Sequence, residues 1–124
     1  LGFKTLTVSG GPDILIDRIK EELQIDYAFS NKLIFGDEKL QGVDVIVGSD
    51  KTIPIKDTIK MMKKQKEDIV ITVDGANDIK LFDVAGLRIS FNGTELINEK
   101  SDSIVNKKDL REIIPIIKEK FNLN

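Results

Sequence analysis

Apolar and polar residues alternate along this chain with two different periods, and the pattern predicts strands that are followed by helices. The runs Thr5–Val8 and Ile69–Val73 are short and apolar, and glycine or acidic residues bound them, which is typical of buried strands. After each run, apolar residues recur at spacings of three and four, which favours amphipathic helices. This alternation predicts an α/β fold with a mainly parallel, Rossmann-like sheet that helices flank.

The first half predicts one strand–helix unit and a small β-hairpin. We expect the first strand to end in a tight turn at Gly10-Gly11, and Pro12 to begin the following helix. The other expected elements are the helix stripe Ile16, Ile19 and Leu23, a strand at Tyr27–Phe29, a hairpin over 32–42 that Val43–Val47 extends or follows, and a helix marked by Ile55, Ile59 and Met62 that reaches about Gln65.

The second half repeats strand and helix with short connections. Pro115 lies inside the last apolar stripe and should kink that helix. The expected elements are a strand at Ile69–Val73, a short helix at Ile79–Ala85 closed by Gly86, a strand at Leu87–Phe91, a helical turn or two at Glu95–Lys100, a strand at Ser103–Val105, and a final helix with Leu110, Ile113, Ile114 and Ile117 on its apolar face.

Length and composition limit the classes of function. The 124 residues fit one domain, 1–124. A net charge of -2 offers no basic field for nucleic acid, so we expect no such partner. The chain has no Cys and no His, so a bound metal must accept oxygen ligands, which favours Mg²⁺ or Ca²⁺. No apolar stretch approaches the roughly 20 residues that span a membrane, and we expect a cytoplasmic protein.

The acidic loop after the strand Ile69–Val73 is the strongest candidate for chemistry. In open α/β sheets the loops at the carboxyl ends of strands bind ligands. Asp74 is placed to bind Mg²⁺. Asp78 is placed to orient Asp74, a bound water or a lysine, and Asn77 to donate to a phosphoryl oxygen. The alternative is that Asp-Gly and Asn-Asp only form a turn and cap the next helix.

A second candidate is the glycine pair that follows the first strand. The Ser9 hydroxyl and the Gly10 backbone can hold phosphoryl oxygens next to a helix N-terminus, although Gly-Gly-Pro is also an ordinary connection from strand to helix. Lys51 and Lys56, both expected ahead of the next helix, are the candidate cations for a phosphate, and the alternative for each is a solvated surface charge.

These segments together resemble the haloacid dehalogenase-like hydrolases. Strand-Ser-Gly-Gly, a lysine ahead of a helix, and strand-Asp-Gly-Ala-Asn-Asp are similar to the second, third and fourth motifs of that family. The segments that resemble its phosphoserine phosphatase branch are 8–11, 25–33, 85–89 and 108–113, so the likeness covers nearly the whole chain.

The resemblance implies roles for individual residues, and it shows that one family motif is absent from these residues. Ser9, Gly10, Lys56 and Asn77 would bind phosphate, Lys56 matching better than Lys51, and Asp74 and Asp78 would form the Mg²⁺ part of the site. Family members usually have a longer segment between the lysine and the metal-binding aspartate than Lys56 to Asp74 provides. Their nucleophile and acid–base aspartates belong to an Asp-x-Asp-x-Thr motif on a central strand, which these 124 residues do not contain.

That absent nucleophile strand would lie between the strands of Leu6 and Val70. We therefore expect a missing N-terminal segment, a homodimer, or direct contact of those two strands to cover the exposed edges.

The first functional hypothesis is the C-terminal part of a Mg²⁺-dependent phosphomonoesterase for a small phosphorylated metabolite, with little activity in this chain alone. The alternative is a noncatalytic, degenerate binding or regulatory module that keeps the fold, with or without a phosphate or metal site. A cation-pump phosphorylation domain shares the Asp-Gly-x-Asn-Asp loop, but the expected Asp-Lys-Thr-Gly-Thr segment does not occur.

Overall fold

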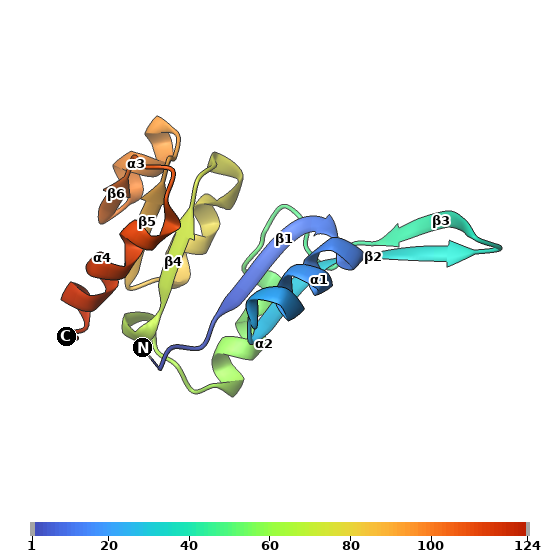
Figure 1. The fold of residues 1–124 in the computed structure, drawn as a ribbon, viewed down its shortest axis with the longest axis horizontal. Helices are drawn as coiled ribbons and strands as arrows, with labels where there is room; N and C mark the ends of the chain where they lie inside the picture. The colour runs from blue at the N-terminus through green and yellow to red at the C-terminus, as the bar shows by residue number, and fades with distance from the viewer. Residues whose placement is uncertain (1, 124) are drawn as a thin grey trace. The chain divides into compact units, whose positions relative to one another are not determined.

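The computed structural model describes residues 2–123 and confirms the α/β class, with parallel strand pairs and flanking helices. The chain divides into two compact units, Leu1–Thr58 and Ile59–Asn124, each with one three-stranded sheet (Figure 1). The expectation of a single domain stays a prediction. No helix within residues 2–123 is long and apolar enough to cross a membrane.

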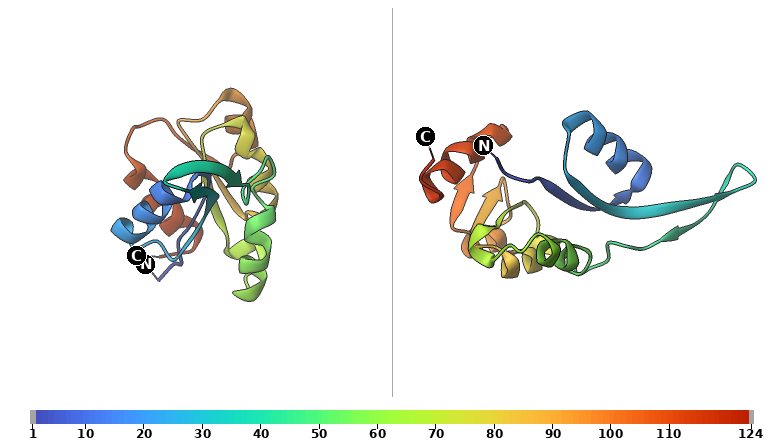
Figure 2. Two further views of the ribbon diagram at one scale, coloured as in Figure 1. Left: turned by 90° about the vertical axis from the view of Figure 1, so that its right-hand side faces the viewer. Right: turned by 90° about the horizontal axis from the view of Figure 1, so that it is seen from below.

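The first unit contains β1 (Leu6–Pro12), α1 (Asp13–Leu23), β2 (Tyr27–Gly36) and β3 (Lys39–Asp44), and the division between the units falls inside α2 (Ile53–Met61). β1 pairs in parallel with β2, which pairs antiparallel with β3, so the expected strand at Tyr27 and the hairpin are one continuous strand and its return. Figure 2 shows α1 along one face of β1 and β2, with the hairpin continuing past it.

Several expectations for the first unit are wrong in detail. Pro12 is the N-cap of α1, with extended φ and ψ, rather than its first helical residue. Leu23 is 69% exposed, so only Ile16 of the expected stripe is fully buried. β3 ends at Asp44, and beyond it the backbone amides of Ile46 and Val47 donate to the side chain of Asn31 instead of to a neighbouring strand. The helix α2 ends at Met61, before Gln65.

The second unit is a parallel sheet with helices on both faces. One cluster of its core consists of Leu87, Ile89 and Val105, and side chains of the last helix pack against these residues. Ser90 points to the opposite face, since side chains alternate along a strand, and its hydroxyl donates to Asn98. The elements are η1 (Lys66–Asp68), β4 (Val70–Val73), η2 (Ala76–Val84), β5 (Leu87–Phe91), α3 (Glu95–Lys100), β6 (Ser103–Val105), η3 (Leu110–Glu112) and α4 (Ile113–Lys120).

The strands of the second unit lie as expected, but two helices differ. The segment Ala76–Val84 forms 3₁₀ turns that begin within the acidic loop, and it ends before Gly86. The final apolar stripe is divided into a 3₁₀ turn and α4, so Pro115 lies in the first turn of α4 instead of kinking a helix interior. A proline there removes no intrahelical hydrogen bond, which explains why it is tolerated.

β1 and β4 each lie at one edge of their own sheet, and among the described residues each has a hydrogen-bonded neighbour on one side only. The sequence led us to expect one unpaired edge on each of the strands of Leu6 and Val70, because the nucleophile strand is absent from these residues. An edge of this kind presents backbone donors and acceptors to another strand.

The Arg88–Asp102 pair ties β5 to the turn before β6 and makes stability depend on pH. The Arg88 side chain and backbone donate to Asp102 at 2.8 to 3.1 Å. The hydrogen bonds from the Arg88 side chain hold the pKa of Asp102 below its usual value, although partial burial opposes them. The stabilisation is therefore complete above the unfolded pKa and is lost as pH falls through the lower folded pKa.

We expect Asp102→Asn to remove this pH dependence. Because both side chains are more than a third exposed, the effect should be below about 1 kcal/mol. Urea unfolding at several pH values between about 6 and 2 measures it, and the wild type should lose more free energy of unfolding on acidification than the variant. Parallel curves for the two proteins would contradict the assignment. Asp83→Asn, at an exposed aspartate of η2, is the matched control.

Candidate functional site

Asp74 follows β4 directly and presents an exposed carboxylate at the carboxyl end of the sheet. The backbone of this residue is held in place, because the Thr94 amide donates to the Asp74 carbonyl oxygen at 3.1 Å. Its backbone is thus fixed while its side chain stays accessible to solvent. This is the arrangement that a cation ligand requires.

The rest of the loop is a tight turn that opens η2. The Asp78 amide donates to the Gly75 carbonyl oxygen at 3.0 Å, and the Asn77 carboxamide folds back so closely that a Cβ on Gly75 would lie 2.6 Å from its oxygen. One carboxylate oxygen of Asp78 is fully buried. Asp74 is therefore the accessible acid of the loop, and Asp78 is built into it.

The donor set of this loop fits a hard cation. Carboxylate and carboxamide oxygens are preferred by Mg²⁺, which typically takes one or two protein carboxylates and keeps several waters. Within residues 2–123, no cluster of three or more acidic side chains forms a complete metal cage. The loop can thus supply part of a Mg²⁺ coordination sphere, with Asp74 as its direct ligand.

The Ser9–Gly11 segment is a bulge within β1 rather than the tight turn expected from the sequence. Val8 pairs with Phe29 and Pro12 with Asn31, so β1 contains two more residues than β2 between these pairs. Neither Gly10 nor Gly11 has a positive φ. The Ser9 hydroxyl oxygen accepts from the Gly11 amide at 3.0 Å, which leaves its own hydrogen able to donate to an anion. Bulges often occur next to active sites, where they redirect side chains.

Asn31 connects this bulge to the segment after the hairpin, a role that we did not predict. Its carboxamide nitrogen donates to the Gly10 carbonyl oxygen at 3.1 Å, and its oxygen accepts from the amides of Ile46 and Val47 at 2.9 and 2.7 Å. The available signal was a run of three polar residues, Ser30, Asn31 and Lys32, within an otherwise largely apolar strand. Asn31 thus positions the backbone of Gly10, a candidate phosphate-binding residue.

Replacing Asn31 should separate its two functions. In Asn31→Ala the amides of Ile46 and Val47 lose their acceptor, and we expect their hydrogen exchange to become about fivefold faster, since one hydrogen bond contributes about 1 kcal/mol. Asn31→Asp keeps an acceptor but loses the donor to Gly10, so these amides should stay protected. Exchange measured by NMR tests this, and equal rates in all three proteins would show that the contacts do not hold the segment.

The two candidate lysines lie at different positions relative to α2. Lys51 lies in the turn before α2 and is half-buried, whereas Lys56 is exposed and lies inside the helix. The expectation that Lys56 precedes the helix is therefore wrong. Its amide donates to the Thr52 carbonyl oxygen at 3.1 Å, as a residue of the first helical turns does.

The structure groups the predicted site residues by unit. Ser9, Gly10 and Lys56 belong to the first unit, and Asp74, Asn77 and Asp78 share one loop of the second. Ser9 and Gly10 lie within β1 and Lys56 lies within α2, whereas the second group comes directly after β4. Their convergence on one phosphate stays a prediction.

Comparison with known proteins places these residues in context. The chain is 42% identical to a phosphoserine phosphatase from Methanocaldococcus jannaschii over 94% of its own length and 57% of that protein. It is 34% identical to a phosphoserine phosphatase from Archaeoglobus fulgidus, over 94% of the chain and 35% of that protein. The chain thus spans little more than half the length of the first relative and about a third of the second. No protein-family model matches it.

Solved structures show the same relationship. A phosphoserine phosphatase in apo form superposes with a TM-score of 0.85 at 41% identity, over 92% of this chain and 58% of that one. A phospho-aspartyl intermediate analogue of phosphoserine phosphatase gives a TM-score of 0.84 at 41% identity, over 93% and 56%. The fold and the sequence therefore indicate the same group of proteins.

Proposed function

Because the chain belongs to the phosphoserine phosphatase branch of the haloacid dehalogenase-like hydrolases, we propose that it carries the phosphate- and Mg²⁺-binding part of a phosphomonoesterase site. The observation that carries this proposal is the exposed Asp74 carboxylate at the end of β4, on a backbone that Thr94 holds. One solved relative is an analogue of a phospho-aspartyl intermediate, so that protein forms a covalent bond between an aspartate and phosphate.

The roles of the residues follow from their chemistry. The Ser9 hydroxyl, the Gly10 backbone and the Asn77 carboxamide hold phosphoryl oxygens, and Asp74 binds Mg²⁺ while Asp78 orients the loop. When bound, Mg²⁺ neutralises phosphate charge and polarises the phosphoryl oxygens. Positioning and electrostatic stabilisation of this kind dominate phosphoryl transfer.

Lys51 is a better candidate than Lys56 for the phosphate cation. It lies directly ahead of α2, as the family motif requires, whereas Lys56 lies within that helix. Choosing Lys51 also lengthens the segment before Asp74, which was too short when measured from Lys56. Phosphate binding should therefore weaken more in Lys51→Ala than in Lys56→Ala, and this pair of variants decides between the two lysines.

Calorimetric titration tests the proposal directly. We expect the chain to bind Mg²⁺, and to bind inorganic phosphate more tightly when Mg²⁺ is present. Because no Asp-x-Asp-x-Thr occurs in these 124 residues, we expect little hydrolysis of phosphoserine. Mg²⁺-dependent hydrolysis by the purified chain that is lost in Asp74→Asn would overturn the expectation of low activity.

The same missing motif favours a second candidate, a noncatalytic module that keeps the fold. A module that has lost the site would bind neither Mg²⁺ nor phosphate, and the titration separates that case from the first candidate. A phosphorylated metabolite as ligand and a cytoplasmic location are further parts of the proposal that the sequence supports.

A further inference from the structure

The β2–β3 hairpin has one apolar face because a bulge changes the alternation of β3. Ile34 pairs with Gly42 and Phe35 with Leu40, so Gln41 is the extra residue. Paired residues share a face, and residues two apart along β2 do as well. The apolar face is therefore formed by Leu33, Phe35, Leu40 and Val43.

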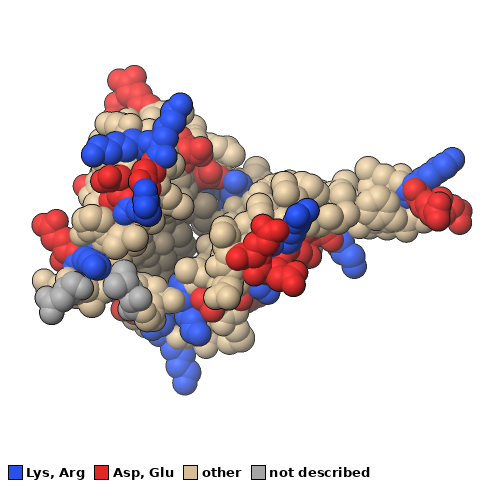
Figure 3. Space-filling model, in the orientation of Figure 1, with Lys and Arg blue, Asp and Glu red and all other residues tan. Residues whose placement is uncertain are grey.

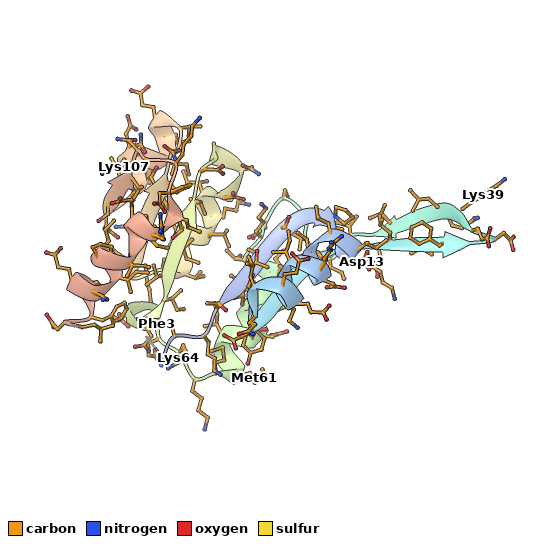
Figure 4. All side chains as sticks on the ribbon, in the orientation of Figure 1. Phe3, Asp13, Lys39, Met61, Lys64 and Lys107 are labelled. Atoms are coloured by element: carbon orange, nitrogen blue, oxygen red, sulfur yellow. The ribbon has the colours of Figure 1, made fainter. Side chains whose placement is uncertain are left out.

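This face is uncovered within the described part of the chain. Phe35, Leu40 and Val43 are 54%, 58% and 49% exposed. In Figure 3 the charged side chains of the hairpin gather near its tip and base, and the surface between them is uncharged. In Figure 4 the labelled Lys39 extends outward from the tip. Exposed contiguous apolar surface of this kind marks an interaction site.

The outer edge of β3 is also free for pairing. The sheet order is β1-β2-β3, so within residues 2–123 β3 has no hydrogen-bonded neighbour on its second side. An exposed edge strand with apolar side chains pairs readily with another strand. A partner strand would therefore add main-chain hydrogen bonds at the edge that borders the apolar face.

The sequence of β3 is complementary to itself. When two copies are aligned antiparallel over the whole of Lys39–Asp44, Lys39 of one copy lies opposite Asp44 of the other, and Leu40 lies opposite Val43. The first pair joins opposite charges, and the second joins two residues of the apolar face. Cross-strand pairs of both kinds stabilise antiparallel strands. This complementarity identifies a second copy as the occupant of the edge.

We propose that two copies of this chain associate through β3, in antiparallel orientation about a two-fold axis between Gln41 and Gly42. The contact is isologous, because each copy contributes the same surface. Six residues form a small interface, so the dimer is weak and depends on concentration.

A single introduced cysteine tests the register, since the sequence has no Cys. In the proposed dimer the two copies of residue 41 are offset by one residue across neighbouring strands, so their Cα atoms are about 6 Å apart, which suits a disulfide. At the tip, the two copies of residue 38 are seven residues out of register, about 23 Å apart. Mild oxidation should link Gln41→Cys into dimers and leave Glu38→Cys monomeric. Equal cross-linking of the two variants, or none, would overturn the proposal.

Sedimentation equilibrium of the whole chain provides a second test that uses the two faces of the hairpin. Leu40→Asp places a charge on the apolar face and should weaken association at least about tenfold. Ile34→Asp makes the same kind of change on the opposite face, where Ile34 is 45% exposed, and should change association less than about threefold. Circular dichroism checks that both variants fold. A wild-type chain that stays monomeric at about 0.5 mM, or equal effects of the two substitutions, would contradict the proposal.

Discussion

Replacing Asp74 with Asn is expected to weaken Mg²⁺ binding by about 100-fold or more. The substitution keeps the size of the side chain and removes the one fully accessible carboxylate of the Asp74–Asp78 loop. Changing a group that only supports a metal ligand typically costs about 10- to 100-fold in affinity, so removing the charge of the ligand itself should cost at least the upper value. Calorimetric titration of the wild type and the variant with MgCl₂ measures the difference.

Asp83→Asn is the matched control for this experiment. Asp83 is exposed and lies in the same unit, in η2, so the substitution removes the same charge outside the loop. We expect Mg²⁺ affinity to change less than about threefold, because exposed charges at a distance are screened. Asp78→Asn should fall between the two, since Asp78 supports the loop. Equal affinities of Asp74→Asn and Asp83→Asn would mean that Mg²⁺ binds elsewhere.

The strands were predictable from the sequence because their signals are local. Runs such as Ile69–Val73 and Leu87–Phe91 combine β-branched residues with clear boundaries, and the structure places β4 and β5 there within one residue. The acidic loop after β4 was predictable for the same reason. Its position depends only on where the strand ends.

The details that sequence did not reveal depend on contacts between distant segments. The bulge at Ser9–Gly11 arises from the register of β1 against β2, and the role of Asn31 from a bond across 21 residues to Gly10. The bulge at Gln41 likewise depends on pairing with β2, and it alone places Leu40 and Val43 on one face. Such long-range geometry leaves no periodic signal in the residues themselves.

Gly86 shows how a correct residue can be assigned the wrong reason. Its position after an apolar segment suggested the end of a helix, where glycine adopts a positive φ. In the structure Gly86 has no positive φ, and the segment before it ends at Val84. A Cβ at this position would instead lie 2.6 Å from the carbonyl oxygen of Lys66 and 2.8 Å from the Cα of Glu67. Glycine is required by close packing of two backbones.

Gly86→Ala should therefore destabilise the second unit by about 2 to 3 kcal/mol, the upper range for overpacking. The clash is with backbone atoms, which cannot rotate away as a side chain does. The amides of Gly86 and Leu87 both donate to the Ile69 carbonyl oxygen, at 3.0 and 3.1 Å, so the two segments cannot separate without losing these bonds. Urea unfolding followed by circular dichroism measures the change.

Gly48→Ala provides the comparison that isolates the steric effect. A Cβ at residue 48 would meet no atom within 4 Å, and its φ is not positive. The substitution should be neutral or stabilise the chain by up to about 1 kcal/mol, because alanine lowers the entropy of the unfolded state. The same entropy gain acts in Gly86→Ala, so the difference between the two variants measures the clash alone. If Gly86→Ala were as stable as Gly48→Ala, the Lys66 turn would have to move away from residue 86 at little cost, and close packing would not be the reason for glycine there.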